Sequence, residues 1–308
     1  MAHAPARASF VSDSLHQRFT EDLQLTGKAP RTQAAYLRAV RQLADHCRCS
    51  PELVTETQLR QYFLHLKNDR QFAQGSLRVA LSGIKFFYAV TCRRDFDTLA
   101  LVKLQNISAL PEVLTAAQVH QIIDAATTQR IATYFWTVYS MGLRLNEGLN
   151  LHVGDIDAAR GLVHIHRGKG AKDRLVPIPT STLRMLRAYW ATHRHKRFLF
   201  PADGRNHSLA RSSLTRHGAS TAKTVMSETA VQGAMKKITT DIDFGKKVSI
   251  HTLRHSYATH LLEAGVGLKA IQKLMGHSSL ATTLVYLHLT ETAEANARTV
   301  IEQLFCRE

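Results

Sequence analysis

The first hundred residues place apolar side chains at the intervals of amphipathic helices. Spacings of three and four predict helices over Ser14–Leu25 and Arg31–Cys47. Thr55 and Ser76 each precede another apolar stripe, and hydroxyl side chains are typical at the first position of a helix. We therefore expect the N-terminal part of the chain to be entirely helical.

The helical periodicity lapses between Leu104 and Leu114, and this lapse predicts a domain boundary. A chain of 308 residues is long enough for two domains with cores of their own. We expect a helical domain over residues 1–108 and a second domain over residues 109–308. In the second domain, Thr115 predicts a helix cap and Ile131–Leu149 predicts one long helix.

The middle of the second domain changes to the alternating pattern of strands. Leu162–His166 and Arg174–Ile178 alternate apolar and polar residues around a glycine-containing turn, which predicts a β-hairpin. The polar stretch over 203–225 predicts a loop. Helices are then expected over Ser227–Thr240, His251–Ala264 and Leu268–Met275, from Ser279 through Tyr286, and over Glu291–Phe305. The predicted fold is mainly α with a small β-sheet: a helical N-terminal domain followed by a mixed α/β domain.

The formal net charge of +16 favours a polyanionic partner, above all nucleic acid. Basic residues occupy the polar faces of several predicted helices in the first domain. They are either an ordinary solvated surface or a surface that neutralises a phosphate backbone. The cations that we single out there are Arg31, Arg78 and Lys85.

Composition narrows the class of protein further. No apolar run reaches the roughly 20 residues of a membrane span, and the first residues lack the shape of a signal peptide. Four scattered cysteines are too few for a disulfide framework, and Cys47 and Cys49 are spaced too closely for a zinc knuckle. We expect a cytoplasmic protein with reduced thiols and no membrane contact.

A set of residues in the second domain carries phosphate chemistry. Guanidinium groups hold phosphate oxygens in forked hydrogen bonds, lysine and histidine move protons, and a tyrosine hydroxyl is a nucleophile. His251 and Arg254 are three positions apart on one predicted helix, so their side chains share a face of that helix. An arginine in an otherwise apolar helix also needs an anion, which Glu147 or Asp155 supplies. The candidate catalytic residues are Arg144, Lys169, His251, Arg254, His277 and Tyr286.

Plainer interpretations compete at several of these positions. His251, His255 and His277 form an alternative zinc site, although the glutamate of a His-Glu-x-x-His hydrolase is missing. His255 is otherwise a packed helix histidine that supports the site. Lys169 and Lys172 share one turn, so either of them is a candidate proton donor. The basic run His193–Arg197 is expected to be a solvated face.

The motifs resemble those of the tyrosine recombinases, also called the lambda-integrase family. Gly-Leu-Arg with a nearby glutamate, then His-x-Leu-Arg-His, Gly-His and a tyrosine follow one another in that family's order. The resemblance spans nearly the whole chain and implies a SAM-like, DNA-clamping N-terminal domain and a catalytic second domain. It implies these roles: Arg144 and Arg254 clamp the scissile phosphate, Lys169 protonates the leaving 5′ oxygen, His251 handles the tyrosine proton, His277 hydrogen-bonds the phosphate and Tyr286 forms the 3′-phosphotyrosyl link.

The resemblance also implies partners and supporting residues. Glu147, Asp155 and His255 would support the site, and Lys172 and Arg174 would contact double-stranded DNA at a specific recombination site. Four protomers would assemble on DNA through the tail that starts at Glu291, in a bacterial, nucleoid-associated protein. The resemblance implies neither metal nor cofactor, and the sequence has no P-loop for ATP. The alternatives are a non-catalytic DNA-binding protein and a type IB topoisomerase-like relaxing enzyme.

Overall fold

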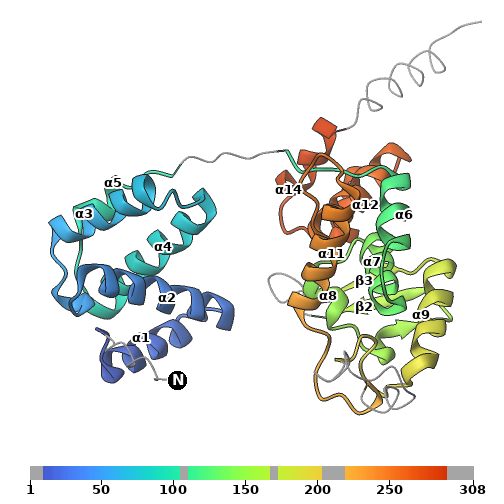
Figure 1. Cartoon of the computed structure of the whole chain (residues 1–308), viewed down its shortest axis with the longest axis horizontal. Helices are drawn as coiled ribbons and strands as arrows, with labels where there is room; N and C mark the ends of the chain where they lie inside the picture. Colours follow the sequence, from blue (N-terminus) through green and yellow to red (C-terminus); the bar gives the residue numbers. More distant parts are fainter. Residues whose placement is uncertain (1–9, 105–109, 167–172, 203–218, 290–308) are drawn as a thin grey trace, which may run out of the picture. The chain divides into compact units, whose positions relative to one another are not determined.

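The computed structural model describes residues 10–104, 110–166, 173–202 and 219–289 (Figure 1). The chain divides into two compact units, Met1–Ser108 and Ala109–Glu308. Mostly helical structure with a small antiparallel sheet confirms the predicted fold class. In the described ranges, no helix has the length and apolar character needed to cross a bilayer.

The described part of the first unit is built from helices around one apolar core. Phe19, Leu43, Leu59 and Ile84 are fully buried in this core and come from four different helices. Local caps agree with the sequence, since Thr55 accepts a hydrogen bond from the Gln58 N–H. The elements are α1 (Asp13–Leu25), α2 (Pro30–Cys47), the 3₁₀ helix η1 (Pro51–Leu53), α3 (Glu56–Leu64) with the π turn η2 (His65–Asp69), α4 (Gln74–Phe86) with the π turn η3 (Phe87–Cys92), and α5 (Asp97–Leu101).

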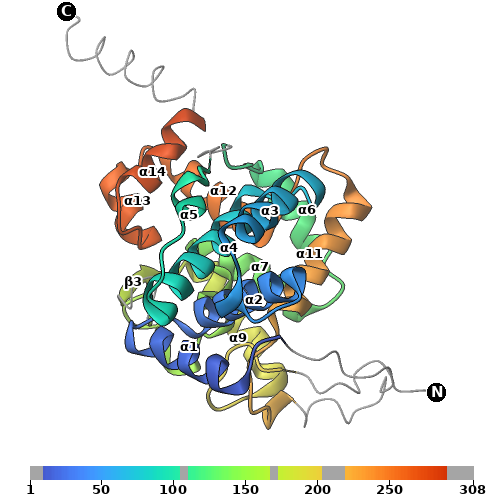
Figure 2. The ribbon, with the colours of Figure 1, turned by 90° about the vertical axis from the view of Figure 1, so that its left-hand side faces the viewer.

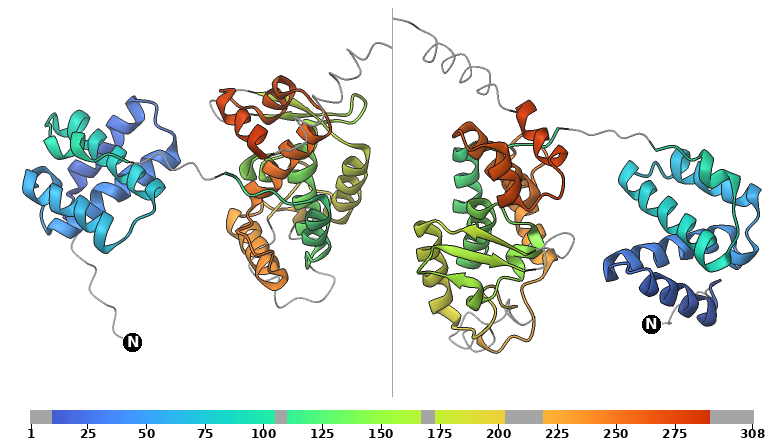
Figure 3. Two further views of the ribbon diagram at one scale, coloured as in Figure 1. Left: turned by 90° about the horizontal axis from the view of Figure 1, so that it is seen from above. Right: turned by 180° about the vertical axis from the view of Figure 1, so that it is seen from behind.

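The second unit packs helices against one face of a three-stranded sheet, and Figure 3 shows the strands side by side. β2 pairs with β1 and β3 in antiparallel register, which places Ile165 opposite Arg174. Its elements are α6 (Ala116–Asp124), α7 (Gln129–Met141), α8 (Leu145–Leu149), η4 (Val153–Asp155), β1 (Ile156–Asp157), β2 (Leu162–Ile165), β3 (Arg174–Pro177), α9 (Thr180–His193), α11 (Glu228–Ile242), α12 (Ile250–Glu263), α13 (Leu268–Met275), α14 (Ala281–Leu284) and the 3₁₀ helix η6 (Val285–Leu289).

The short C-terminal helices gather beside α12, as Figures 1 and 2 show from two directions. Tyr286, Ala258, Ile271 and Met275 form a small buried cluster of their own in this part of the unit. Tyr286 therefore belongs to a packed layer that joins η6, α12 and α13.

Two expectations about the fold were wrong, and one helix was missed. The predicted helix Ile131–Leu149 is broken, because Gly142 adopts a left-handed conformation with φ of +59° and α8 starts anew at Leu145. The helix α9 was not predicted. The run His193–Arg197 is not a uniformly solvated face, since His193 and His195 are each only 6% exposed.

The buried imidazole of His195 organises the turn after α9. Its Nδ1 accepts hydrogen bonds from the backbone N–H groups of Arg197 and Phe198. Its Nε2 lies 2.9 Å from the carbonyl oxygen of Ala222, in the last part of the predicted loop 203–225. Val225 of that stretch also forms a β-bridge with Pro201. Residues 203–218 of the predicted loop lie outside the described residues.

Candidate active site

Arg144 stands at the start of α8, directly after the break at Gly142. Its backbone N–H donates to Glu147 Oε2 at 2.8 Å, and its Nη1 donates to Glu147 Oε1 at 2.7 Å. Glu147 thus accepts from both the backbone and the side chain of the residue that precedes the first turn of α8.

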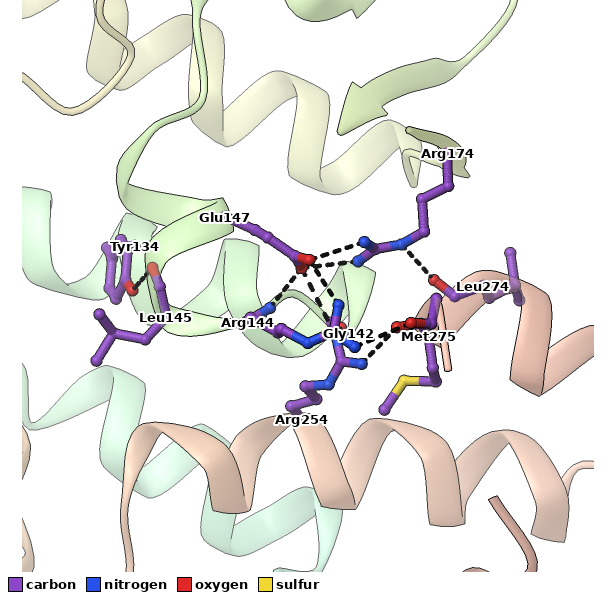
Figure 4. A network of polar contacts seen from close by, with 10 residues as sticks. Tyr134, Gly142, Arg144, Leu145, Glu147, Arg174, Arg254, Leu274 and Met275 are labelled. Carbon is purple, nitrogen blue, oxygen red and sulfur yellow. Dashed lines mark hydrogen bonds and ion pairs between the residues drawn. The ribbon is translucent and has the colours of Figure 1, made fainter. Parts of the chain in front are cut away.

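Glu147 connects Arg144 to two further arginines (Figure 4). Arg174 on β3 donates from Nη1 and Nη2 to the two carboxylate oxygens at 2.8 and 2.7 Å, and its Nε donates to the Leu274 carbonyl. Arg254 Nη1 lies 3.6 Å from Glu147 Oε2. The Glu147 side chain is only 7% exposed, and burial raises its pKa. Hydrogen bonds and charge from Arg174, with further bonds from Arg144, outweigh burial and lower that pKa to about 2.

The Arg254 guanidinium is held by backbone carbonyls as well as by charge. It donates to the carbonyl oxygens of Gly142 and Met275 (Figure 4). Burial, and then the neighbouring positive charge of Arg144, lower the pKa of Arg254 to about 9, which leaves it protonated at neutral pH. Arg144 Nη2 likewise donates to the carbonyl of Gly276 at 2.9 Å. The turn after α13 therefore fixes both guanidiniums in position.

The Tyr286 hydroxyl lies next to a histidine that the sequence did not assign to it. His255 Nδ1 is 2.9 Å from Tyr286 Oη, whereas His251 was the expected partner. Burial lowers the pKa of His255 to about 4, so its imidazole is neutral at pH 7. Burial also raises the pKa of Tyr286, although the charges of Arg254 and Arg144 act against this.

The remaining two candidate histidines differ in exposure. His277 is half-buried, its Nδ1 lies 2.9 Å from Thr283 Oγ1, and burial lowers its pKa to about 4. His251, at the start of α12, keeps more exposed surface than His277; the partial burial of its ring, followed by the charge of Arg254, lowers its pKa. Neutral imidazoles offer one N–H donor and one acceptor each, which suits proton transfer and hydrogen bonding to phosphate.

These side chains line one cavity of about 440 Å³ in the second unit. The cavity brings together five of the six candidates with His255; they are Arg144, His251, Arg254, His277 and Tyr286. Lys169, the sixth candidate, and Lys172 lie outside the described residues. A concave site with two fixed guanidiniums, imidazoles and a phenol is suited to a phosphate diester.

The alternative zinc site is not formed in the described part of the chain. His251, His255 and His277 do not bring three ligand atoms together there, and two of these rings are hydrogen-bonded to hydroxyl groups. Asp155, offered as an anion for Arg144, instead lies 3.0 Å from His166 Nε2. Glu147 is the carboxylate that pairs with Arg144.

Arg174 was expected among the DNA-contacting residues, whereas its side chain points inward and is only 8% exposed. The pairing of the two strands explains this inward position. Arg174 lies opposite the buried Ile165, so both side chains are on the inner face of the hairpin. The other cations singled out for DNA contact, Arg31, Arg78 and Lys85, are exposed on the first unit.

Comparison with known proteins identifies the class. Residues 112–293 match the model of the phage integrase family, and residues 15–98 match that of the phage integrase N-terminal SAM-like domain. The chain belongs to the phage integrase family, whose members include tyrosine recombinases.

Individual relatives extend the similarity over most of the chain. The protein y4qK of Sinorhizobium fredii, an integrase/recombinase by name, is 34% identical over 91% of this chain and 85% of its own length. Tyrosine recombinase XerA of Thermococcus onnurineus is 32% identical over 87% of this chain and 88% of its own. The solved Tn1549 transposon integrase, in complex with a circular intermediate DNA, shares the fold with a TM-score of 0.66 at 16% identity, covering 94% of this chain and 99% of that one.

Proposed function

We propose that this protein is a site-specific DNA recombinase that cuts and rejoins duplex DNA through a 3′-phosphotyrosyl intermediate. The proposal depends on one observation: Arg144, Arg254 and Tyr286 converge on one cavity. The Glu147 carboxylate fixes the side chain of Arg144 there. Family membership supports the same conclusion. In this proposal residues 1–108 clamp the DNA and residues 109–308 carry out the reaction.

Arg144 and Arg254 supply the positive charge that the reaction needs. In phosphoryl transfer, negative charge spreads over the non-bridging oxygens, and preorganised donors stabilise it without reorganising. Because Glu147 and backbone carbonyls fix these two side chains before DNA binds, their N–H groups are preorganised for a phosphate. Removing one such donor typically costs about a hundredfold to a thousandfold in rate. We infer that cleavage requires neither a divalent ion nor ATP.

The proposed covalent step replaces one phosphoester bond of the DNA by another, and side chains of the site move the protons. The Tyr286 oxygen forms a bond to phosphorus and the phosphorus–O5′ bond breaks, while the phenolic proton passes to an imidazole and the 5′ oxygen takes a proton from Lys169. The phosphotyrosyl bond keeps the energy of the broken ester, so a second 5′ hydroxyl rejoins the strand by the reverse reaction. His277 donates to a non-bridging oxygen, and His251 and His255 are the candidate acceptors for the phenolic proton.

Double-stranded DNA is the proposed partner. The net charge of +16 and the exposed cations Arg31, Arg78 and Lys85 favour a polyanion. The structurally similar Tn1549 transposon integrase was solved in complex with DNA. Exchange of strands between two duplexes requires four cuts, hence four protomers on DNA, for which the tail from Glu291 is the proposed contact.

The test is a nicked suicide substrate, on which cleavage releases a short fragment with a free 5′ hydroxyl and so traps the covalent complex. Incubated in EDTA with DNA of the recombination site, the wild type should give a complex that resists denaturing detergent, and Tyr286→Phe should bind the DNA without forming it. Tyr36→Phe is the matched control and should behave as the wild type. A wild type that binds but never forms the complex would indicate a non-catalytic DNA-binding protein, and relaxation of supercoils without site preference would indicate the topoisomerase-like alternative.

A further inference from the structure

A second cluster of chemically active side chains lies on the outer face of the hairpin. His164 and His166 are two residues apart in sequence, so their side chains project from the same face of the β2 strand and its continuation. The register of β2 and β3, with Ile165 opposite Arg174, places Asp173 opposite His166 on that face. The proposed recombinase chemistry uses none of these three residues.

The ligand atoms of this cluster converge on one point. Asp173 Oδ2 lies 3.1 Å from His164 Nε2 and 3.5 Å from His166 Nδ1. All three ligand atoms are within 4.8 Å of one another. In a tetrahedral zinc site with bonds near 2.0 Å, ligand atoms are separated by about 3.3 Å, so the cluster needs little rearrangement to surround a metal ion.

The supporting contacts also match those of a metal site. Metal-binding histidines usually direct their second ring nitrogen to a carboxylate, which fixes the ring and raises its basicity. Here His166 Nε2 lies 3.0 Å from Asp155 Oδ1. Asp155 is itself held, since its Oδ2 accepts the His152 backbone N–H at 2.8 Å and its side chain is 9% exposed.

An ordinary set of ion pairs explains this arrangement less well. The centroids of the His164 and His166 rings are 3.9 Å apart, and both rings direct a nitrogen to the same oxygen of Asp173. Protonating both rings would place two positive charges side by side on one carboxylate. A divalent cation between two neutral imidazoles and the carboxylate satisfies all three groups at once.

We propose that His164, His166 and Asp173 bind a divalent transition metal, Zn²⁺ in the first instance, with Asp155 positioning His166. The site goes beyond the proposed recombinase reaction, because its groups come from the hairpin and not from α8, α12 or the turn after α13. His166 and Asp173 flank residues 167–172 in the sequence, which include Lys169. The bound ion therefore joins the two ends of that segment.

The experiment measures metal binding alone and uses no DNA. Full-length protein is stripped with EDTA, desalted and titrated with Co²⁺, and Zn²⁺ is then added to displace it. The visible d–d absorption of Co²⁺ reports its coordination number, and charge-transfer bands in the near ultraviolet report thiolate ligands. His164→Ala and His166→Ala each remove one ligand. His16→Ala, on exposed α1, is the matched control, and far-UV circular dichroism checks that each variant is folded.

The proposal expects one equivalent of Co²⁺ with nitrogen and oxygen ligands, released by Zn²⁺. That binding is lost in His164→Ala and His166→Ala, kept in His16→Ala, and about 10- to 100-fold weaker in Asp155→Asn. Absence of stoichiometric binding, equal binding by all variants, or a thiolate charge-transfer band would overturn it. Failure of the protein to form a covalent DNA complex would leave this result unaffected, so the two proposals fail separately.

Discussion

The Tyr286 hydroxyl is hydrogen-bonded to His255 Nδ1 at 2.9 Å, and the tyrosine side chain is buried. Tyr286 is only 2% exposed and packs with Ala258, Ile271 and Met275. In the DNA-free protein the proposed nucleophile is therefore held in a packed layer, although it borders the cavity. In the proposed reaction, attack on DNA would therefore require η6 to shift and expose the phenol.

We predict that Tyr286 is chemically protected until DNA binds. Acetylation by N-acetylimidazole, followed by mass spectrometry of peptides, should modify Tyr286 several-fold more slowly than the half-buried Tyr36. His255→Ala should accelerate labelling of Tyr286 because the hydroxyl loses its partner. Equal labelling of Tyr286 in the wild type and in His255→Ala would contradict a restraining role for this hydrogen bond.

Glu147→Gln should destabilise the second unit by about 3 kcal/mol, because three arginines lose their buried counter-charge. The chain has two tryptophans, Trp136 and Trp190, and both lie in this unit, so fluorescence during urea unfolding reports on it alone. Glu263→Gln, on the exposed side of α12, is the control and should stay within about 0.5 kcal/mol of the wild type. A similar loss in both variants would remove the special role assigned to Glu147.

Glu147 should also give the second unit an acid-dependent stability. Its pKa of about 2 in the folded protein is below its ordinary value of 4.5, so the unfolded chain binds more protons between these pH values. The contribution, about 3 kcal/mol, is fully present above pH 4.5 and is lost as the pH falls toward 2. Urea unfolding followed by tryptophan fluorescence from pH 6 to pH 2 should show a steeper loss for the wild type than for Glu147→Gln. Parallel curves would contradict the assignment.

Arg174→Lys should be costly even though it keeps the charge. Arg174 donates to both oxygens of Glu147 and to the Leu274 carbonyl, a geometry that a lysine ammonium does not reproduce. We expect a loss of about 2 kcal/mol in the free energy of unfolding and slower covalent-complex formation at unchanged DNA affinity. Arg184→Lys, exposed on α9, should match the wild type. Weakened DNA affinity without a stability change would instead restore Arg174 as a direct DNA contact.

Gly142→Ala should disrupt the start of the site. A Cβ at Gly142 would lie 2.3 Å from Cδ1 of Tyr257, and its φ of +59° disfavours any other residue. Conformational strain and overpacking together predict a loss of about 3 kcal/mol. Gly154→Ala, where a Cβ meets nothing within 4 Å, is the matched control. Tolerance of alanine at Gly142 would show that Tyr257 moves aside freely.

Most of the helical architecture was predictable because its signals are local. Thr55, Thr115 and Ser227 cap the helices that they were expected to cap, and apolar spacing located the cores of both units. The strands of the hairpin also fell where alternation placed them.

The errors arose where tertiary contacts override local patterns. The segment Ile131–Leu149 has helical periodicity throughout, and periodicity does not reveal the left-handed stop at Gly142, where the packing of Tyr257 also leaves no room for a side chain. His193 and His195 look like part of a basic surface run, yet a turn buries both rings and bonds one of them to Ala222. The partner of Tyr286 was likewise decided by the packing of η6 on α12, and not by residue spacing.

The contacts that hold Arg144 and Arg254 join segments that lie far apart in the chain. Arg144 and Glu147 belong to α8, while the carbonyls that hold the guanidiniums include those of Met275 and Gly276. Synthesis runs from the N-terminus, so a nascent chain contains Arg144 before it contains the turn at Met275 and Gly276 that holds this side chain. Copies that stop before Met275 therefore lack the carbonyls of Met275 and Gly276 that help to hold Arg254 and Arg144, and in the proposed reaction they would not cut DNA.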